Sequence, residues 1–141
     1  MDIRLQNPTR ALRIAVGLMA TLAGLDKFFN ILADWSTYIS PFAAQLLPIP
    51  PEILMGVVGV IEMAVGISVL TVWPALGAYT ASAWLVLVAG NLVLGGHLDI
   101  AVRDAVLAVA AFTLARLTIV EHQAVKVRDA GVEPVRQRVT A

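Results

Sequence analysis

The sequence predicts an all-α fold: an integral membrane four-helix bundle with a short interfacial or re-entrant helix between its first and second spans. Two observations lead to this prediction. The chain of 141 residues is 59% hydrophobic and only 14% charged, whereas about 25% of the residues of a soluble domain are charged. It also contains four mostly apolar runs, each close to the ~20 residues that a helix needs to cross the hydrocarbon of a bilayer.

The predicted spans are bounded by residues that begin and end helices. Pro8 suits the first position of the first helix, Glu52 places an acid at the positive end of the second, and Asp99 can cap the fourth. Only Trp73 and Pro74 separate the second span from the third, which predicts a tight antiparallel hairpin. The spans cover roughly residues 9–32, 52–72, 75–94 and 100–120.

The connection between the first two spans, residues 33–51, is apolar and contains no Lys or Arg. Ser40 and Pro41 can start a short helix that runs through Leu47. Trp35 and Tyr38 are typical of the aromatic belt at a membrane interface. We therefore expect this segment to cover the outer end of the bundle.

The basic residues predict the orientation of the spans. The first span resembles a secretory signal, but no small-residue cleavage site follows it, so an uncleaved helix is expected. An even number of spans puts both termini on one side, and the excess of basic residues predicts that this side is cytoplasmic. Residues 1–120 then form the four-span domain, and residues 121–141 a basic, partly disordered cytoplasmic tail. Lys27 and Arg103 approach the outer side, whereas the terminal side carries Arg4, Arg10, Arg13, Arg116, Lys126, Arg128, Arg136 and Arg138.

Composition excludes several kinds of chemistry. Ten basic residues balance ten acidic residues, so there is no overall basic field to attract nucleic acid. The absence of cysteine excludes disulfides, thiolate metal sites and cysteine nucleophiles. His97 and His122 are expected at opposite ends of the bundle, which argues against a metal site and against an axial histidine pair for haem. No catalytic residue and no certain cofactor are indicated.

Glu62 is the most informative single residue. It lies near the middle of the second span, where a lone carboxylate is costly, so it must be protonated, paired or exposed to a polar cavity. Lys27 is a candidate partner, since it ends a stripe of small residues on the first span. A structural ion pair that fixes the bundle and a group that also contacts a ligand or a proton both remain open.

A second group of polar residues is predicted near the outer end of the bundle. It comprises Lys27, Asn91, His97, Asp99, Arg103 and Asp104. These residues could line a pocket beneath residues 33–51, or Lys27 and Arg103 could instead extend to the headgroups while the acids cap helices. Asp26 points to a different face and is expected at the interface. The candidate ligand-binding residues are Lys27, Glu62, Asn91, Arg103 and Asp104.

Three short sequences stand out, Leu12–Leu18 with Gly24–Phe28, Glu62–Gly66, and Asp99–Asp104, in that order. They resemble the DoxX family of small four-helix bacterial membrane proteins, which includes relatives of the DoxD subunit of thiosulfate:quinone oxidoreductase. The resemblance implies a location in the bacterial inner membrane and association with redox or sulfur-oxidising machinery. It raises the expectation of a bound quinone, although the absence of cysteine argues against thiol chemistry on this chain.

The leading functional hypothesis is a non-catalytic binding or scaffold subunit of a quinone-linked membrane redox complex. Its expected partners are the lipid bilayer and oxidoreductase subunits. A second hypothesis is a pathway for a small solute or protons, built by a homo-oligomer with Glu62 as a relay. A third is a purely structural or assembly protein, in which the charges only fix the register of the helices.

Overall fold

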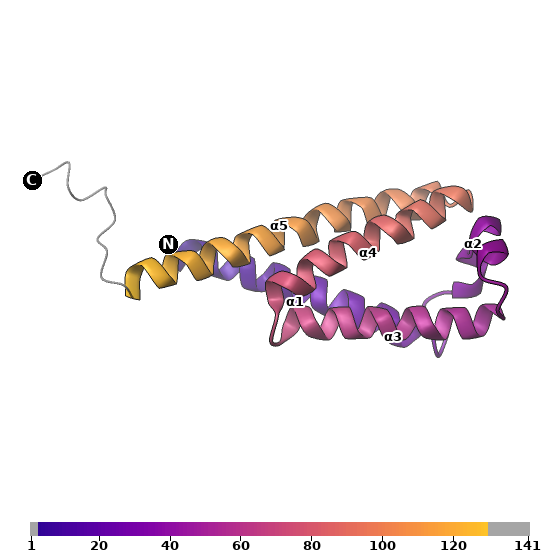
Figure 1. Ribbon diagram of the computed structural model, residues 1–141, viewed down its shortest axis with the longest axis horizontal. Helices are drawn as coiled ribbons and strands as arrows, with labels where there is room; N and C mark the ends of the chain where they lie inside the picture. The colour runs from indigo at the N-terminus through magenta and orange to yellow at the C-terminus, as the bar shows by residue number, and fades with distance from the viewer. Residues whose placement is uncertain (1–2, 130–141) are drawn as a thin grey trace, which may run out of the picture.

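The computed structural model describes residues 3–129, and within them it contains helices and connecting segments but no strand (Figure 1). Four long helices are joined by one long connection and two tight ones. The predicted all-α class is thereby confirmed for these residues. The elements are α1 (Ile3–Asp26), the 3₁₀ turn η1 (Trp35–Tyr38), α2 (Pro41–Leu46), α3 (Pro51–Leu70), α4 (Pro74–Leu94) and α5 (Leu98–Asp129).

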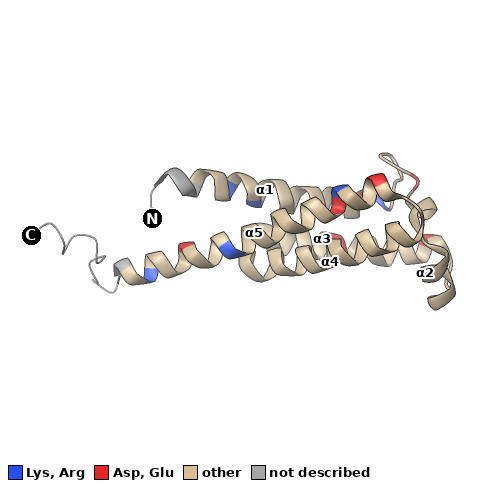
Figure 2. Ribbon diagram, turned by 90° about the horizontal axis from the view of Figure 1, so that it is seen from above, with Lys and Arg blue, Asp and Glu red and all other residues tan. Residues whose placement is uncertain are grey.

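The long helices form two antiparallel pairs, α1 with α3 and α4 with α5. The hairpin between α3 and α4 joins the pairs at one end, and from there the pairs diverge toward η1 and α2 at the other end (Figure 1). Helix α1 begins and α5 ends at the same end of the molecule (Figures 1 and 2). The connection between α1 and α3 therefore lies at the wide end of the molecule.

Small residues fill the interior, and large apolar residues lie outside. The central cluster consists mainly of alanine and valine, with Leu114 as its largest member. Leucine, isoleucine, valine and phenylalanine side chains are exposed along all four long helices. Small interior residues allow close helix packing, which is the main source of helix association in a bilayer.

Two of the described helices, α3 and α4, are long and apolar enough to cross a membrane. Helix α4 carries no charged residue, and α3 carries only Glu52 and Glu62, as the long uncharged stretches in Figure 2 show. This agrees in part with the membrane fold predicted from composition. The number of spans stays a prediction.

Helix α1 differs from the predicted span at both ends. It begins at Ile3, so Pro8 lies inside the helix and not at its first position. It ends at Asp26, six residues before the expected boundary, because the Asp26 carboxylate accepts hydrogen bonds from the backbone N–H groups of Ile31 and Leu32. The side chain thus stabilises a turn that draws the following residues out of the helical path.

Helix α5 is also longer than expected. It begins at Leu98, with Asp99 in its first turn and not at the cap, and it continues through Asp129. Residues 121–129, which were assigned to the predicted tail, contain neither glycine nor proline and extend the helix without interruption. The expectation of partial disorder beyond Asp129 lies outside the described residues.

The connections around α2 and α3 form as predicted. Ser40 caps α2, its hydroxyl accepting a hydrogen bond from the N–H of Ala43 at 3.1 Å, and Pro41 occupies the first position. At the far end of α3, the Arg13 guanidinium donates to the carbonyl oxygens of Val69 and Leu70 at 2.8 and 2.7 Å. A cation is favourable at this negative helix end, and it ties α1 to the hairpin.

Helices α1 and α3 approach so closely that only glycine fits at the crossing points. A Cβ atom at Gly24 would lie 2.6 Å from the carbonyl oxygen of Gly59, and one at Gly59 would lie 2.6 Å from that of Gly24. One heptad along, a Cβ at Gly66 would meet the Gly17 oxygen at 2.7 Å. The predicted small-residue stripe of the first span is therefore its contact face with α3.

Candidate functional site: a buried ion pair between two tryptophans

Lys27 and Glu62 form a buried ion pair. The Lys27 Nζ atom lies 2.6 Å from Glu62 Oε2, and the side chains are only 6% and 12% exposed. The pair forms because α1 ends halfway along α3, which places Lys27 at the level of Glu62 and not nearer the outer end. The paired state of Glu62, one of the three predicted from the sequence, is the one that the structure contains.

Two tryptophans flank the pair. The Lys27 ammonium lies 3.9 Å from the ring centre of Trp35, within the range of a cation–π contact. On the other side, the indole N–H of Trp84 donates to Glu62 Oε1 over 3.4 Å. Helices α3 and α4 and turn η1 thus all contribute to the surroundings of the ion pair.

Asp26 positions Trp35 over Lys27. Its Oδ2 atom accepts from the Trp35 indole N–H at 2.8 Å and from the Leu32 backbone N–H at 3.0 Å. Asp26 itself is buried, because these donors fold around it; its expected position at the membrane interface stays a prediction. Trp35, which was expected in the aromatic belt at the membrane interface, also has a specific hydrogen-bond partner, the Asp26 carboxylate, for its indole N–H. No residue spacing signals this contact, which depends on where α1 ends.

The Asn91 side chain joins the connection between α1 and α3 to α4 through hydrogen bonds. Its side-chain oxygen accepts from the Ser40 N–H at 3.1 Å, and its amide nitrogen donates to the Tyr38 carbonyl at 2.7 Å. His97 adds a second attachment, with Nε2 3.2 Å from the Thr37 carbonyl and its ring centre 5.0 Å from that of Tyr38. Both side chains therefore hold the segment that covers the wide end of the molecule.

Arg103 and Asp104 pair with each other on α5. The Arg103 guanidinium lies 3.0 Å from Asp104 Oδ1, with the Arg103 side chain 59% exposed and the Asp104 side chain 8% exposed. The structure thus distributes the candidate residues into three arrangements: the Lys27 and Glu62 pair, the Asn91 attachment, and the pair on α5. The first of these has the most buried charges.

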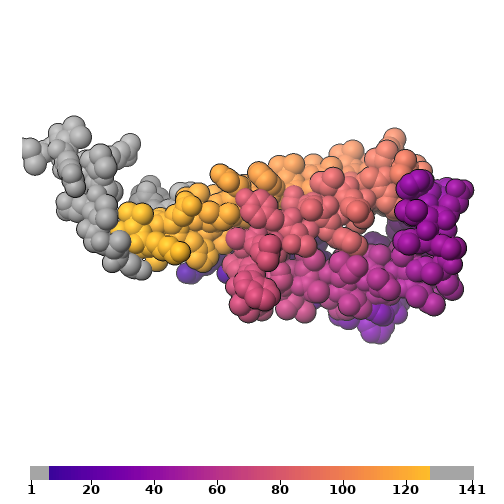
Figure 3. Space-filling model, in the orientation of Figure 1, coloured from indigo at the N-terminus to yellow at the C-terminus, as the bar shows by residue number. Residues whose placement is uncertain are grey.

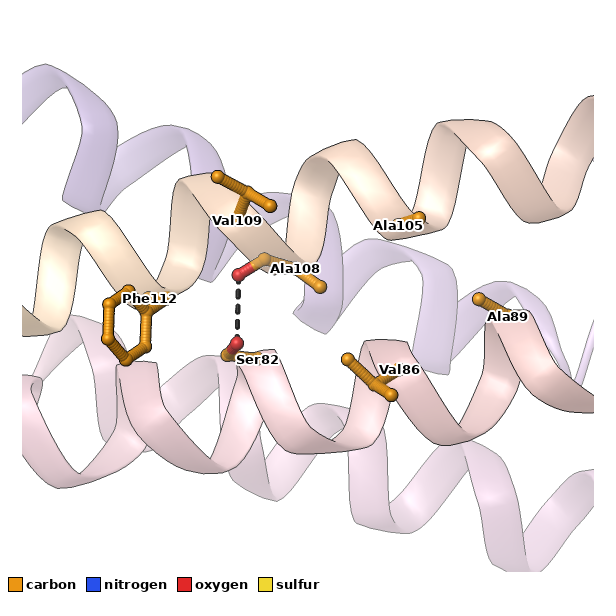
Figure 4. Close-up of a pocket in the computed structure, with 7 residues that line it drawn as sticks. All are labelled: Ser82, Val86, Ala89, Ala105, Ala108, Val109 and Phe112. Atoms are coloured by element: carbon orange, nitrogen blue, oxygen red, sulfur yellow. Dashed lines mark hydrogen bonds between the residues drawn. The ribbon is translucent and has the colours of Figure 1, made fainter.

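Figure 3 shows a hollow between α3 and α4, beside α2, on the side where the two helices diverge. A separate, shallow apolar groove of about 280 Å³ lies between α4 and α5 (Figure 4). The hydroxyl of Ser82 in this groove already donates to the Ala108 carbonyl at 2.8 Å, so the groove lacks a free polar group. It is lined by Ser82, Val86, Ala89, Ala105, Ala108, Val109 and Phe112.

Within the described part of the chain, no group of three or more His, Asp or Glu residues is arranged to hold a metal ion. Comparisons with family models, with characterised proteins and with solved structures find no match to this chain.

The ion pair and its neighbours provide polar atoms that can contact a ligand. Lys27 directs its charge to Glu62 and Trp35, whereas Glu62 Oε1 has only the long bond from Trp84. Glu62 Oε1 is thus an acceptor and the Trp84 indole N–H a donor, and the two groups lie side by side between α3 and α4. This is a pair of groups that can orient the polar head of a ligand.

Proposed function

We propose that this chain is a DoxX-like integral protein of the bacterial inner membrane, which crosses the bilayer four times with both termini in the cytoplasm. It serves as a non-catalytic binding or scaffold subunit of a quinone-linked redox complex. The apolar exterior of the four long helices and their small-residue interior support the membrane location.

The observation that carries the binding role is the Lys27 and Glu62 pair with its two tryptophans. A structural ion pair needs only its own two members, but here Glu62 Oε1 also faces an indole N–H at a distance longer than the usual ~2.9 Å. An amphiphile suits this arrangement, since its head can reach the polar atoms while its tail lies along apolar helix surfaces. A quinone can be held here through a hydrogen bond that one of its ring oxygens accepts from the Trp84 indole N–H.

The proposed topology predicts a definite labelling pattern. The chain has no cysteine of its own, so single cysteines report one position each. Ser36→Cys is expected to react with an impermeant maleimide added outside intact cells or spheroplasts. Arg4→Cys and Arg136→Cys are expected to react only after permeabilisation. Reaction of Ser36→Cys only from the cytoplasmic side would overturn the proposed orientation.

The binding role predicts that quinone accompanies the protein. Protein extracted in a mild detergent should contain quinone detectable by mass spectrometry, together with an oxidoreductase partner. Trp84→Leu should reduce the quinone content several-fold, since it removes the indole beside Glu62, whereas Trp73→Leu on the exposed hairpin should not. Equal quinone in both variants and in the parent protein would indicate nonspecific lipid carry-over.

A further inference from the structure

The hydrogen bond between Trp84 and Glu62 is the weakest polar contact at the ion pair. Its 3.4 Å length exceeds the usual 2.7–3.2 Å of an N–H···O bond. The other Glu62 oxygen, by contrast, contacts Lys27 at 2.6 Å. A charged carboxylate oxygen can accept shorter and stronger bonds than the one it receives from Trp84. Glu62 Oε1 and Trp84 Nε1 therefore retain capacity for a further partner.

These two atoms lie between α3 and α4, about halfway along each helix. On α3, the face of Glu62 continues one and two turns toward the connection with Val58 and Met55, and on α4 the face of Trp84 continues with Val88. All three side chains are half-buried. Farther along α4, Asn91 attaches the connection. Apolar side chains of α3 and α4 thus lie next to the polar pair, on the way toward the hollow that Figure 3 shows beside α2.

We propose that Glu62 and Trp84 bind the hydroxyl head of an amphiphile between α3 and α4, and that they therefore select a quinol over the corresponding quinone. The hydroxyl would donate to Glu62 Oε1 and accept from the Trp84 indole N–H, so that two ordinary hydrogen bonds replace one long bond. This inference rests on the proposed binding function and adds the chemistry of the head group.

The two oxidation states differ in what they offer to the carboxylate. A quinone carbonyl has only lone pairs, so it can accept from Trp84 but repels the Glu62 oxygen beside it. A quinol hydroxyl satisfies both groups. Because hydrogen bonds to charged partners are worth about twice those between neutral groups, the quinol is expected to bind about ten- to a hundredfold more tightly.

The test compares decylubiquinol and decylubiquinone on the full-length protein in phosphatidylcholine nanodiscs, by anaerobic isothermal titration calorimetry. The quinol is expected to show the tighter Kd. Competition with 1-dodecanol separates two sources of the hydroxyl: displacement of the quinol supports a site for lipid alcohols, and failure to displace it supports a site that requires the aromatic head.

Two variants assign the preference to the named atoms. Glu62→Gln keeps an oxygen for Lys27 but presents an amide that can donate, so the preference for quinol is expected to shrink at least several-fold. Trp84→Phe keeps an aromatic ring without the N–H, and it should weaken both ligands. Trp73→Phe, on an exposed tryptophan outside the site, is the matched control and should change neither affinity.

Equal affinity for quinol and quinone, or an unchanged preference in Glu62→Gln, would overturn the inference and leave the proposed binding function standing. Absence of binding by either ligand would overturn both.

Discussion

Replacing Lys27 with methionine is expected to lower the free energy of unfolding by about 3–5 kcal/mol, because it leaves the buried Glu62 carboxylate without its partner. Glu62→Leu should have an effect of similar size, since it leaves the Lys27 ammonium unpaired. The double variant Lys27→Met/Glu62→Leu should be much closer to the parent protein, because it removes both buried charges together. The measurement is reversible denaturation in detergent micelles, arranged as a double-mutant cycle.

Arg10→Met provides the control for this cycle. Arg10 is an exposed cation on the same helix, and substitution of such a surface residue usually changes stability by no more than ~0.5 kcal/mol. If the effects of the two single substitutions at Lys27 and Glu62 simply add in the double variant, the residues act independently and the ion pair does not stabilise the bundle.

The second large effect is expected at the crossing of α1 and α3. Gly24→Ala would place a Cβ atom 2.6 Å from the Gly59 carbonyl oxygen and 2.8 Å from the Met63 nitrogen. Both are backbone atoms, so the helices themselves must separate. We expect a net loss of about 1–3 kcal/mol, in spite of the better helix propensity of alanine. Gly24→Leu should lose more, and thermal unfolding in the same detergent measures both variants.

Gly90 offers a matched control on α4. A Cβ at this position meets nothing within 4 Å, so Gly90→Ala should gain up to ~1 kcal/mol from helix propensity alone. The two substitutions are chemically identical and differ only in surroundings. Should Gly24→Ala also stabilise the protein, α1 and α3 would not approach as closely as described.

The local elements were largely predictable because their signals are local. The Trp73 and Pro74 hairpin, the Ser40 cap with Pro41, and the apolar stretches of α3 and α4 each depend on residues within one or two turns. The stripe through Gly17 and Gly24 was predicted to be a packing face for the same reason, since helical periodicity alone brings its members together.

The limits of α1 and α5 were less predictable. Asp26 ends α1 because its carboxylate accepts hydrogen bonds from the N–H groups of residues five and six positions later. Whether the chain continues as a helix or turns at this point depends on contacts that form only in the folded protein. At the other end, α5 continues through Asp129 since the residues that favour a stop, Gly131 and Pro134, come later.

The sequence by itself determined that the chain is helical and apolar, that small residues form the contact faces, and that Glu62 must be protonated, paired or exposed to a polar cavity. Only the tertiary structure decided which partner it has. Lys27 reaches Glu62 because α1 ends halfway along α3, and Trp35 and Trp84 join them from segments eight and twenty-two residues away from the ion-pair members that they contact. Contacts between separate elements depend on where each helix ends and how closely two helices approach. Both are set by packing in three dimensions and not by periodicity along one segment.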